Sequence, residues 1–140
     1  DGPERVNIEQ MSRDCSLCDN VTFLGKQEKI EELLAVADIF LMPSESESFG
    51  LAALEAMACE VPVISSNAGG IPEINIHGET GFLSNIGDVE DMAKNAILLL
   101  KDEEKLAKFK ENALKQAKKF KIDAILPIYE NSYKKALAKK

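Results

Sequence analysis

The predicted fold is decided by ESFGLAALE, residues 47–55, in which a small turn opens a helix. Gly50 lets a ligand approach the backbone closely, and a helix start offers free N–H groups and a partial positive charge that favour phosphate. At about 1.5 Å per residue, Glu55 should lie roughly 7–8 Å along the axis from Gly50, about the reach of a diphosphate. Glu47 and Glu55 could then bind hydroxyls at its two ends, as in a nucleotide-sugar. The alternative is an ordinary amphipathic helix with two solvated glutamates.

Apolar runs alternate with helical patterns on both sides of this stretch. Strands are predicted at residues 21–24, 38–42, 61–65 and 82–83, and helices at residues 28–37 and 50–59, with a further short helix opened by Pro72. Continuous apolar strands between helices are typical of a parallel sheet that is covered on both faces. The sequence therefore predicts an α/β fold with a partial, Rossmann-like doubly wound parallel sheet.

The rest of the chain predicts a helical C-terminal tail. Asp88 is a good N-cap for a helix with Met92, Ala96 and Leu99 on one face, and two more helices should run over residues 103–120 and from residue 122 to the end.

The composition fits a soluble domain of ordinary size. The chain has 140 residues, of which 45% are hydrophobic, and its net charge of −7 argues against nucleic acid as a partner. No apolar run reaches the roughly 20 residues of a membrane span. Cys15, Cys18 and Cys59 are too few for a disulfide framework, which favours a cytoplasmic location. Cys15 and Cys18 have the spacing of a zinc or redox pair, but two ordinary thiols are the simpler interpretation because a zinc site needs more ligands.

Two loops should line one crevice. In doubly wound sheets, ligands bind at the carboxyl ends of the strands. Residues 43–50 and residues 66–70 both follow predicted strands, so the turn before Leu51 and the Gly69-Gly70 pair should meet there. Such a glycine pair alone is weak support, since most are merely turns.

The segment from Pro43 to Glu73 resembles the retaining glycosyltransferases of the GT-B fold, in the large family that includes sucrose and glycogen synthases. That family carries a Glu-x7-Glu motif, and Glu47 and Glu55 have its spacing. The resemblance covers essentially the whole chain, and its other matching stretches are DGPE (1–4), FLG (23–25), EAMAC (55–59), VPVI (61–64), GGIPE (69–73) and TGF (80–82).

The resemblance implies a role for each matching residue. Glu47, the catalytic candidate, would hydrogen-bond the hydroxyls of the donor sugar, and Glu55 would bind the ribose. The sugar and diphosphate would meet the backbone amides of Ser48, Phe49, Gly50 and Leu51, and the nucleobase would be bordered by Gly25 and Lys26. The sugar would be transferred with retained anomeric configuration, the leaving diphosphate helping to deprotonate the acceptor. Stabilisation of charge on that diphosphate would be the large catalytic contribution, and no metal or other cofactor is implied.

Two stretches narrow the expected substrates. LGKQ (24–27) and SNAGGIPE (66–73) resemble a bacterial branch of the family that joins N-acetylglucosamine to L-malate in bacillithiol synthesis. This implies UDP-N-acetylglucosamine as the donor and L-malate as the acceptor.

The same resemblance predicts that residues 1–140 are a C-terminal nucleotide-sugar-binding domain. The N-terminal acceptor domain, a basic Arg/Lys pair and the first two strands of the donor domain are then expected outside it. The strand at residues 21–24 would be separated from the other three by a gap. We expect such a fragment to be inactive alone and to fold poorly or in a rearranged form.

Two further interpretations remain open. A nucleotide-sugar epimerase of similar fold could use the same ribose and phosphate contacts without an acceptor, and a non-catalytic nucleotide-binding module would bind without turnover.

Glu60 stands where the family usually has a glycine that ends the helix in a left-handed conformation, so glutamate there should cost about 1 kcal/mol.

Overall fold

A computed structural model describes residues 2–138 of the chain. The elements, in order, are α1 (Arg5–Asp14), α2 (Ile30–Leu34), β1 (Phe40–Met42), α3 (Leu51–Ala58), β2 (Val63–Ser66), α4 (Ile71–Ile74), β3 (Gly81–Ser84), α5 (Val89–Leu100), α6 (Glu103–Lys118) and α7 (Ile122–Leu137). The chain divides into two compact units, residues 1–30 and residues 31–140, and each is described by itself.

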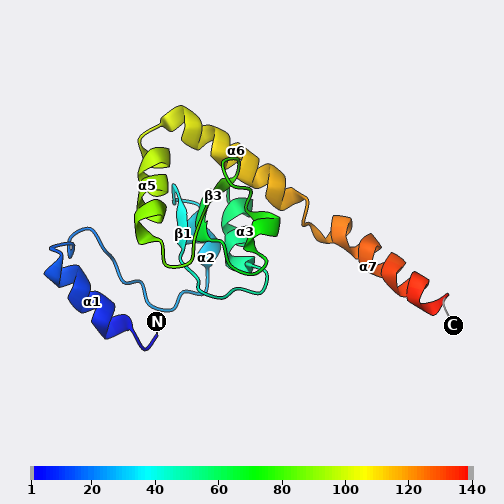
Figure 1. Cartoon of the computed structure of the whole chain (residues 1–140), viewed down its shortest axis with the longest axis horizontal. Helices are drawn as coiled ribbons and strands as arrows, with labels where there is room; N and C mark the ends of the chain where they lie inside the picture. The colour runs from blue at the N-terminus through cyan, green and yellow to red at the C-terminus, as the bar shows by residue number, and fades with distance from the viewer. Residues whose placement is uncertain (1, 139–140) are drawn as a thin grey trace. The chain divides into compact units, whose positions relative to one another are not determined.

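The larger unit is built on the predicted parallel sheet. The strands lie in the order β1-β2-β3, with Leu41 beside Ile64 and Ile64 beside Phe82. Figure 1 shows α5 and α3 on either side of these strands, with α6 running across. The α/β, doubly wound prediction is therefore confirmed for this unit.

Each face of the sheet carries its own hydrophobic cluster. Val63 packs in a cluster with α3 residues such as Met57 and with Ala113 of α6. Ile64 packs in a second cluster with Phe82 of β3 and residues of α5 and α6. Because successive residues of a strand point to opposite faces, the two clusters cover both faces of β2. All four residues of that strand are buried, which explains its continuous apolar start.

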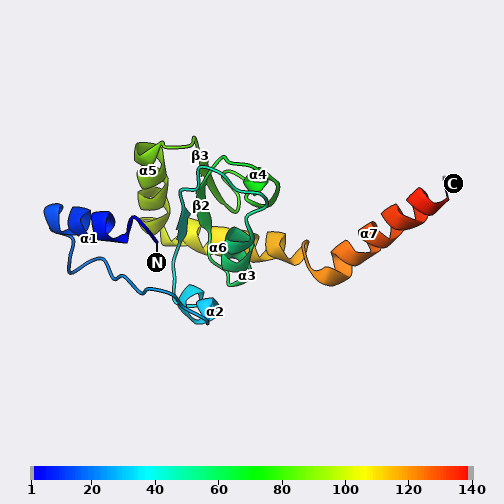
Figure 2. The ribbon, with the colours of Figure 1, turned by 90° about the horizontal axis from the view of Figure 1, so that it is seen from below.

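Most helix boundaries agree with those predicted from the sequence. The Asp88 carboxylate accepts a hydrogen bond from the Asp91 N–H at 3.0 Å, so the predicted N-cap of α5 is confirmed. The short helix α4, labelled in Figure 2, begins at Ile71, so Pro72 takes its second position rather than the first. The helix predicted from residue 122 to the end is α7, although its last residues, 139–140, lie outside the described part of the chain.

The strand predicted at residues 21–24 is wrong. These residues form no strand in the smaller unit, and their polar groups make local bonds instead. The Val21 N–H donates to the Leu17 carbonyl at 3.0 Å, and the Gln27 side chain donates to the Leu24 carbonyl at 2.7 Å. An apolar, β-branched run becomes a strand only where a neighbouring strand completes its ladder.

The sequence prediction did not include α1. This helix is largely polar, and Ser12 is its only residue classed as buried, so no apolar stripe marks it. An ion pair from Arg5 Nε to Glu9 Oε1, at 2.7 Å and one turn apart, supports it instead.

Candidate functional site

The two loops predicted to share a crevice are in direct contact. A Cβ atom added to Gly69 would lie 1.6 Å from the Glu47 carbonyl oxygen, and one added to Gly70 would lie 2.6 Å from that of Ser48. No side chain can occupy either place. Gly69 also has a φ of +52°, which disfavours other residues. The glycine pair is therefore a packing surface on which the backbone of residues 47–48 rests.

The start of α3, next to this contact, has no side-chain cap. Gly50 is its N-cap residue, with a φ of +93°. The first turn carries no acidic residue, so the positive end of the helix dipole is not neutralised locally. A Cβ atom on Gly50 would lie 3.1 Å from Ile74 Cδ1 and 3.3 Å from Ile71 Cγ1, so α4 packs against this turn. Helix starts of this kind bind anions.

Glu47 is half-buried beside this helix start, and its carboxylate bends back on the chain. Its Oε1 accepts a hydrogen bond from the Ser48 N–H at 3.0 Å. Ser48 was predicted to offer that amide to the donor. In this structure the amide is engaged, so a donor would use it only after the Glu47 side chain turns away.

Glu55 lies one turn into α3, on the same exposed face as Leu51. The opposite face of the helix carries the buried residues Ala53, Ala56 and Met57. Phe49 is half-buried, and its ring meets that of Phe120 edge-on with centroids 5.9 Å apart. The structure thus brings together the predicted site residues from 47 to 55, while their contacts with a donor stay predictions.

Gly25 and Lys26 belong to the smaller unit, and both are exposed. Gly25 has a φ of +68°, and a Cβ atom there would lie 3.7 Å from Arg5 Nη1. The Arg5 guanidinium also lies 6.0 Å from the centre of the Phe23 ring. Within this unit, the residues predicted to border a nucleobase are therefore next to a stacked cation and aromatic ring.

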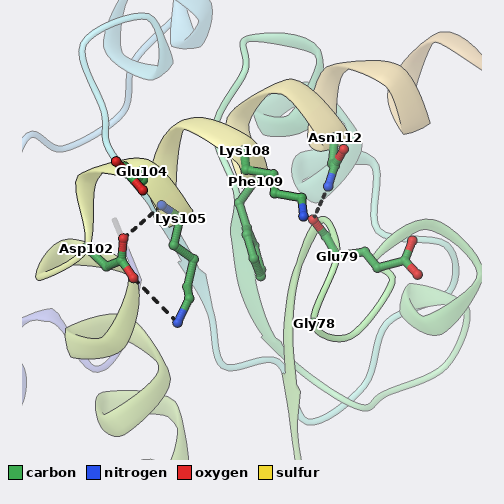
Figure 3. A pocket seen from close by; sticks show the side chains of 8 residues that line it. All are labelled: Gly78, Glu79, Asp102, Glu104, Lys105, Lys108, Phe109 and Asn112. Carbon is green, nitrogen blue, oxygen red and sulfur yellow. Dashed lines mark hydrogen bonds and ion pairs between the residues drawn. The ribbon is translucent and has the colours of Figure 1, made fainter.

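A depression of about 700 Å³ lies at the other end of the strands, near the turn before β3 (Figure 3). One ion pair lies in it, with Lys105 Nζ 3.7 Å from Asp102 Oδ2, and the Asn112 amide donates a hydrogen bond to the Glu79 carbonyl at 3.1 Å. Its lining residues are Gly78, Glu79, Asp102, Glu104, Lys105, Lys108, Phe109 and Asn112. Three carboxylates against two ammonium groups make it a poor match for a diphosphate.

Cys15 and Cys18 are exposed free thiols. Within residues 2–138, no group of three or more His, Cys, Asp or Glu side chains could hold a metal ion. In the same residues, no helix is long and apolar enough to cross a membrane. On α6, a hydrogen bond from Lys115, and then its charge, lower the pKa of the exposed Glu111 carboxyl.

Comparison with known proteins decides the family. The profile described as "Glycosyl transferases group 1" matches residues 1–116. The chain belongs to this family. Group 1 glycosyltransferases similar to it include the N-acetyl-alpha-D-glucosaminyl L-malate synthase of Bacillus anthracis, 47% identical over 134 residues, which are 95% of this chain and 35% of that protein.

Solved structures agree with the family. Sucrose-phosphate synthase from Thermosynechococcus elongatus superposes with a TM-score of 0.88 at 32% identity, over 99% of this chain and 36% of that one. HepE of Anabaena, in complex with UDP, gives a TM-score of 0.88 at 30% identity, over 93% of this chain and 36% of that one. The fold is that of the C-terminal domain of GT-B glycosyltransferases, and the chain spans about a third of the length of these relatives.

Gly69 and Gly70 support the Glu47 turn but were not among the predicted site residues, and the only signal for this role in the sequence is the glycine pair itself. Asn75, whose side chain hydrogen-bonds both β2 and β3, gives no signal, because a single asparagine after a short helix is ordinary in any sequence.

Proposed function

We propose that this chain binds a UDP-sugar as the donor-binding domain of a retaining glycosyltransferase. The observation that carries the proposal is the packing of Gly69 against the Glu47 carbonyl, next to the uncapped start of α3. It supports an anion site with one carboxylate at the helix start and another one turn further along the helix. HepE, a relative of the same fold, has been crystallised with UDP and with UDP-glucose.

The proposal gives each residue the role that the family resemblance implies, and the positions of the residues are compatible with these roles. The diphosphate would accept hydrogen bonds from the amides of Phe49, Gly50 and Leu51, with the helix dipole favouring its charge. Glu47 would turn from the Ser48 amide to the sugar hydroxyls. Glu55, exposed on the outer face of α3, would accept hydrogen bonds from the ribose hydroxyls.

These contacts would assist the departure of UDP. As the glycosidic bond breaks, negative charge grows on the diphosphate, and fixed amide donors stabilise that charge without reorganisation. The departing phosphate oxygen would take the proton of the acceptor hydroxyl on the same face of the sugar, which retains the anomeric configuration. No metal ion is needed in this scheme.

We further propose UDP-N-acetylglucosamine as the donor and L-malate as the acceptor. This choice is supported by the 47% identity to the N-acetyl-alpha-D-glucosaminyl L-malate synthase of Bacillus anthracis, which extends over most of the chain. The exposed thiols Cys15 and Cys18 suit a reducing compartment, so we place the enzyme in the cytoplasm. We propose that the acceptor is bound mainly by residues outside this chain. The chain alone should therefore bind the donor without transferring its sugar.

Calorimetric titration with UDP and with UDP-N-acetylglucosamine tests the roles separately. Glu55→Gln should weaken both ligands roughly tenfold or more, because a hydrogen bond to a charged group contributes about 1.5–3 kcal/mol. Glu47→Gln should weaken only the sugar nucleotide. Glu45→Gln, an exposed residue of the same loop, is the matched control and should change neither. Equal effects of all three variants would reject the assignment.

Product analysis then distinguishes the possible activities. The 140-residue chain, and any longer protein of which it is a part, are each incubated with UDP-N-acetylglucosamine, with and without L-malate. An α-linked malate glycoside from such a longer protein supports the proposal. An isomerised or hydrolysed sugar nucleotide that forms without acceptor would instead favour an epimerase-like enzyme, and binding without any turnover would favour a nucleotide-binding module.

A further inference from the structure

Asn75 makes more buried hydrogen bonds through its side chain than any other residue described in residues 2–138. It is fully buried and follows directly after α4. Its Nδ2 lies 3.0 Å from the Val63 carbonyl, 3.0 Å from Ser65 Oγ and 3.2 Å from the Phe82 carbonyl. Its Oδ1 accepts from the Thr80 hydroxyl at 3.1 Å. Carbonyl oxygens only accept, which fixes the orientation of the amide.

The sheet makes room for this side chain at Gly81. A Cβ atom on Gly81 would lie 1.8 Å from the Val63 carbonyl oxygen and 2.6 Å from Asn75 Oδ1. Val63 and Gly81 are register partners on β2 and β3. The Asn75 amide therefore lies against two paired strands, at a place where Gly81 can have no side chain.

The helix that Asn75 ends is a single turn. Gly70 caps its start and Asn75 its end, so the two lie roughly 7–8 Å apart along the axis. At the start of the turn, Gly69 and Gly70 support the backbone of Glu47 and Ser48. At its end, the Asn75 N–H closes the turn on the Ile71 carbonyl at 2.9 Å. Any movement of Asn75 is thus transmitted over one helical turn.

The apolar residues of α4 anchor the helix in the core, but they do not fix its rotation about its own axis. Ile71 and Ile74 are fully buried, and both approach Gly50. Apolar contacts are not directional, whereas hydrogen bonds are. The hydrogen bonds of Asn75 therefore fix the rotation of the single-turn helix α4, and with it the positions of Gly69 and Gly70.

We propose that Asn75 is a positioning residue for the donor site, because its buried amide fixes α4 and thereby the glycine pair that supports Glu47 and Ser48. The inference rests on the proposed function, since it assigns the donor to that turn. Asn75 itself touches no ligand. It acts through the backbone of residues 69–70.

The test compares two buried asparagines. Asn75→Leu removes the amide and keeps a branched side chain with the same number of heavy atoms. Asn95→Leu is the matched control, because Asn95 is also buried and bonds Asp91 at 3.0 Å from α5, on the other face of the sheet. Both variants should lower the melting temperature. At a temperature where both are folded by circular dichroism, Asn75→Leu should raise the Kd for UDP roughly tenfold, while Asn95→Leu should leave it within about twofold.

Hydrogen exchange gives a readout that does not need UDP. In Asn75→Leu, amides of residues 47–50 and 69–70 should exchange faster relative to those of β2, and in Asn95→Leu they should not. If the parent chain fails to bind UDP, the proposed function fails, while this exchange pattern still tests Asn75. Equal effects of the two variants on binding and exchange, or none from Asn75→Leu, would overturn the inference.

A milder variant covers the case in which Asn75→Leu does not fold. Thr80→Val preserves the shape but removes the hydroxyl, which donates to Asn75 Oδ1 and also accepts from the Ile76 N–H. It should raise the Kd for UDP by a smaller factor and loosen the same amides. If Asn75→Leu and Thr80→Val both unfold while Asn95→Leu folds, Asn75 serves stability alone and the inference is wrong.

Discussion

Glu60 adopts a backbone conformation that suits glycine. Its φ is +64°, and among residues 2–138 only one other non-glycine residue, Ser16, has a positive φ. The left-handed geometry expected after the helix of residues 50–59 is thus confirmed. A residue with a Cβ atom costs about 1 kcal/mol more than glycine in this region.

Glu60→Gly should therefore stabilise the chain by up to about 1 kcal/mol, the relief of strain being partly offset by the freer unfolded chain. Urea unfolding measures the change. Glu45→Gly, at an exposed loop residue without positive φ, should instead lower stability. A loss of stability in Glu60→Gly as well would mean that interactions of its side chain outweigh the strain.

Gly69 and Gly78 separate strain from close packing. Both have positive φ, but a Cβ atom on Gly78 meets nothing within 4 Å, whereas one on Gly69 would overlap the Glu47 carbonyl. Gly78→Ala should cost about 1–2 kcal/mol, from the backbone alone. Gly69→Ala should cost several kcal/mol by displacing the Glu47 turn, and UDP binding should be lost. Comparable costs and intact UDP binding in both variants would show that the turn adapts freely.

At the scale of one element, α3 can be tested as an anion site. Ala52 and Ala58 are exposed residues at its two ends. A glutamate near the helix start interacts favourably with the dipole, by about 0.3–1 kcal/mol, but repels a bound diphosphate. Ala52→Glu should therefore raise stability and weaken UDP binding at the same time. Thermal melting and calorimetry, at low salt, measure the two effects.

Ala58→Glu supplies the control at the end of the same helix. There the dipole is unfavourable, so stability should fall slightly, and the distance from Gly50 should leave UDP binding unchanged. Equal weakening of UDP by both variants would point to a general charge effect. No weakening by Ala52→Glu would place the diphosphate elsewhere.

Elements with a local signal could be predicted from the sequence. The strands around Leu41, Ile64 and Phe82 are short apolar runs, and Asp88 marks its own helix start, so these predictions are confirmed. Residues 21–24 show the limit of the method. Their pattern is that of a strand, but strand formation depends on a partner that the local pattern does not reveal.

The candidate site divides in the same way. The spacing of Glu47 and Glu55 follows from one helix, so sequence alone could suggest it. The contact of Gly69 with the Glu47 carbonyl joins residues 22 positions apart, and the bonds of Asn75 join α4 to two strands. Such contacts depend on how the sheet and helices pack. The spacing of apolar residues, which indicates helices and strands, does not predict them.

At the scale of the whole molecule, the core lies in one unit. Every buried residue of the two hydrophobic clusters falls between Leu34 and Ala117, and so does the start of α3. In place of the poor or rearranged folding expected from the sequence, we therefore predict that residues 31–140 fold without residues 1–30, in one cooperative transition close to that of the full chain. Circular dichroism during heating tests this expectation. A non-cooperative melt would show that the smaller unit completes the core.

The same truncation tests whether residues 1–30 contribute to UDP binding. Inorganic pyrophosphate needs only the amides at the start of α3, so residues 31–140 should bind it as well as the full chain does. The family resemblance implies that Gly25 and Lys26 border the nucleobase, so the affinity for UDP should fall roughly tenfold in the truncated chain. Lys26→Ala in the full chain should reproduce part of that loss without changing pyrophosphate binding. A preference for UDP over pyrophosphate that survives the truncation would move the nucleobase site into residues 31–140, and the roles of Gly25 and Lys26 would be withdrawn.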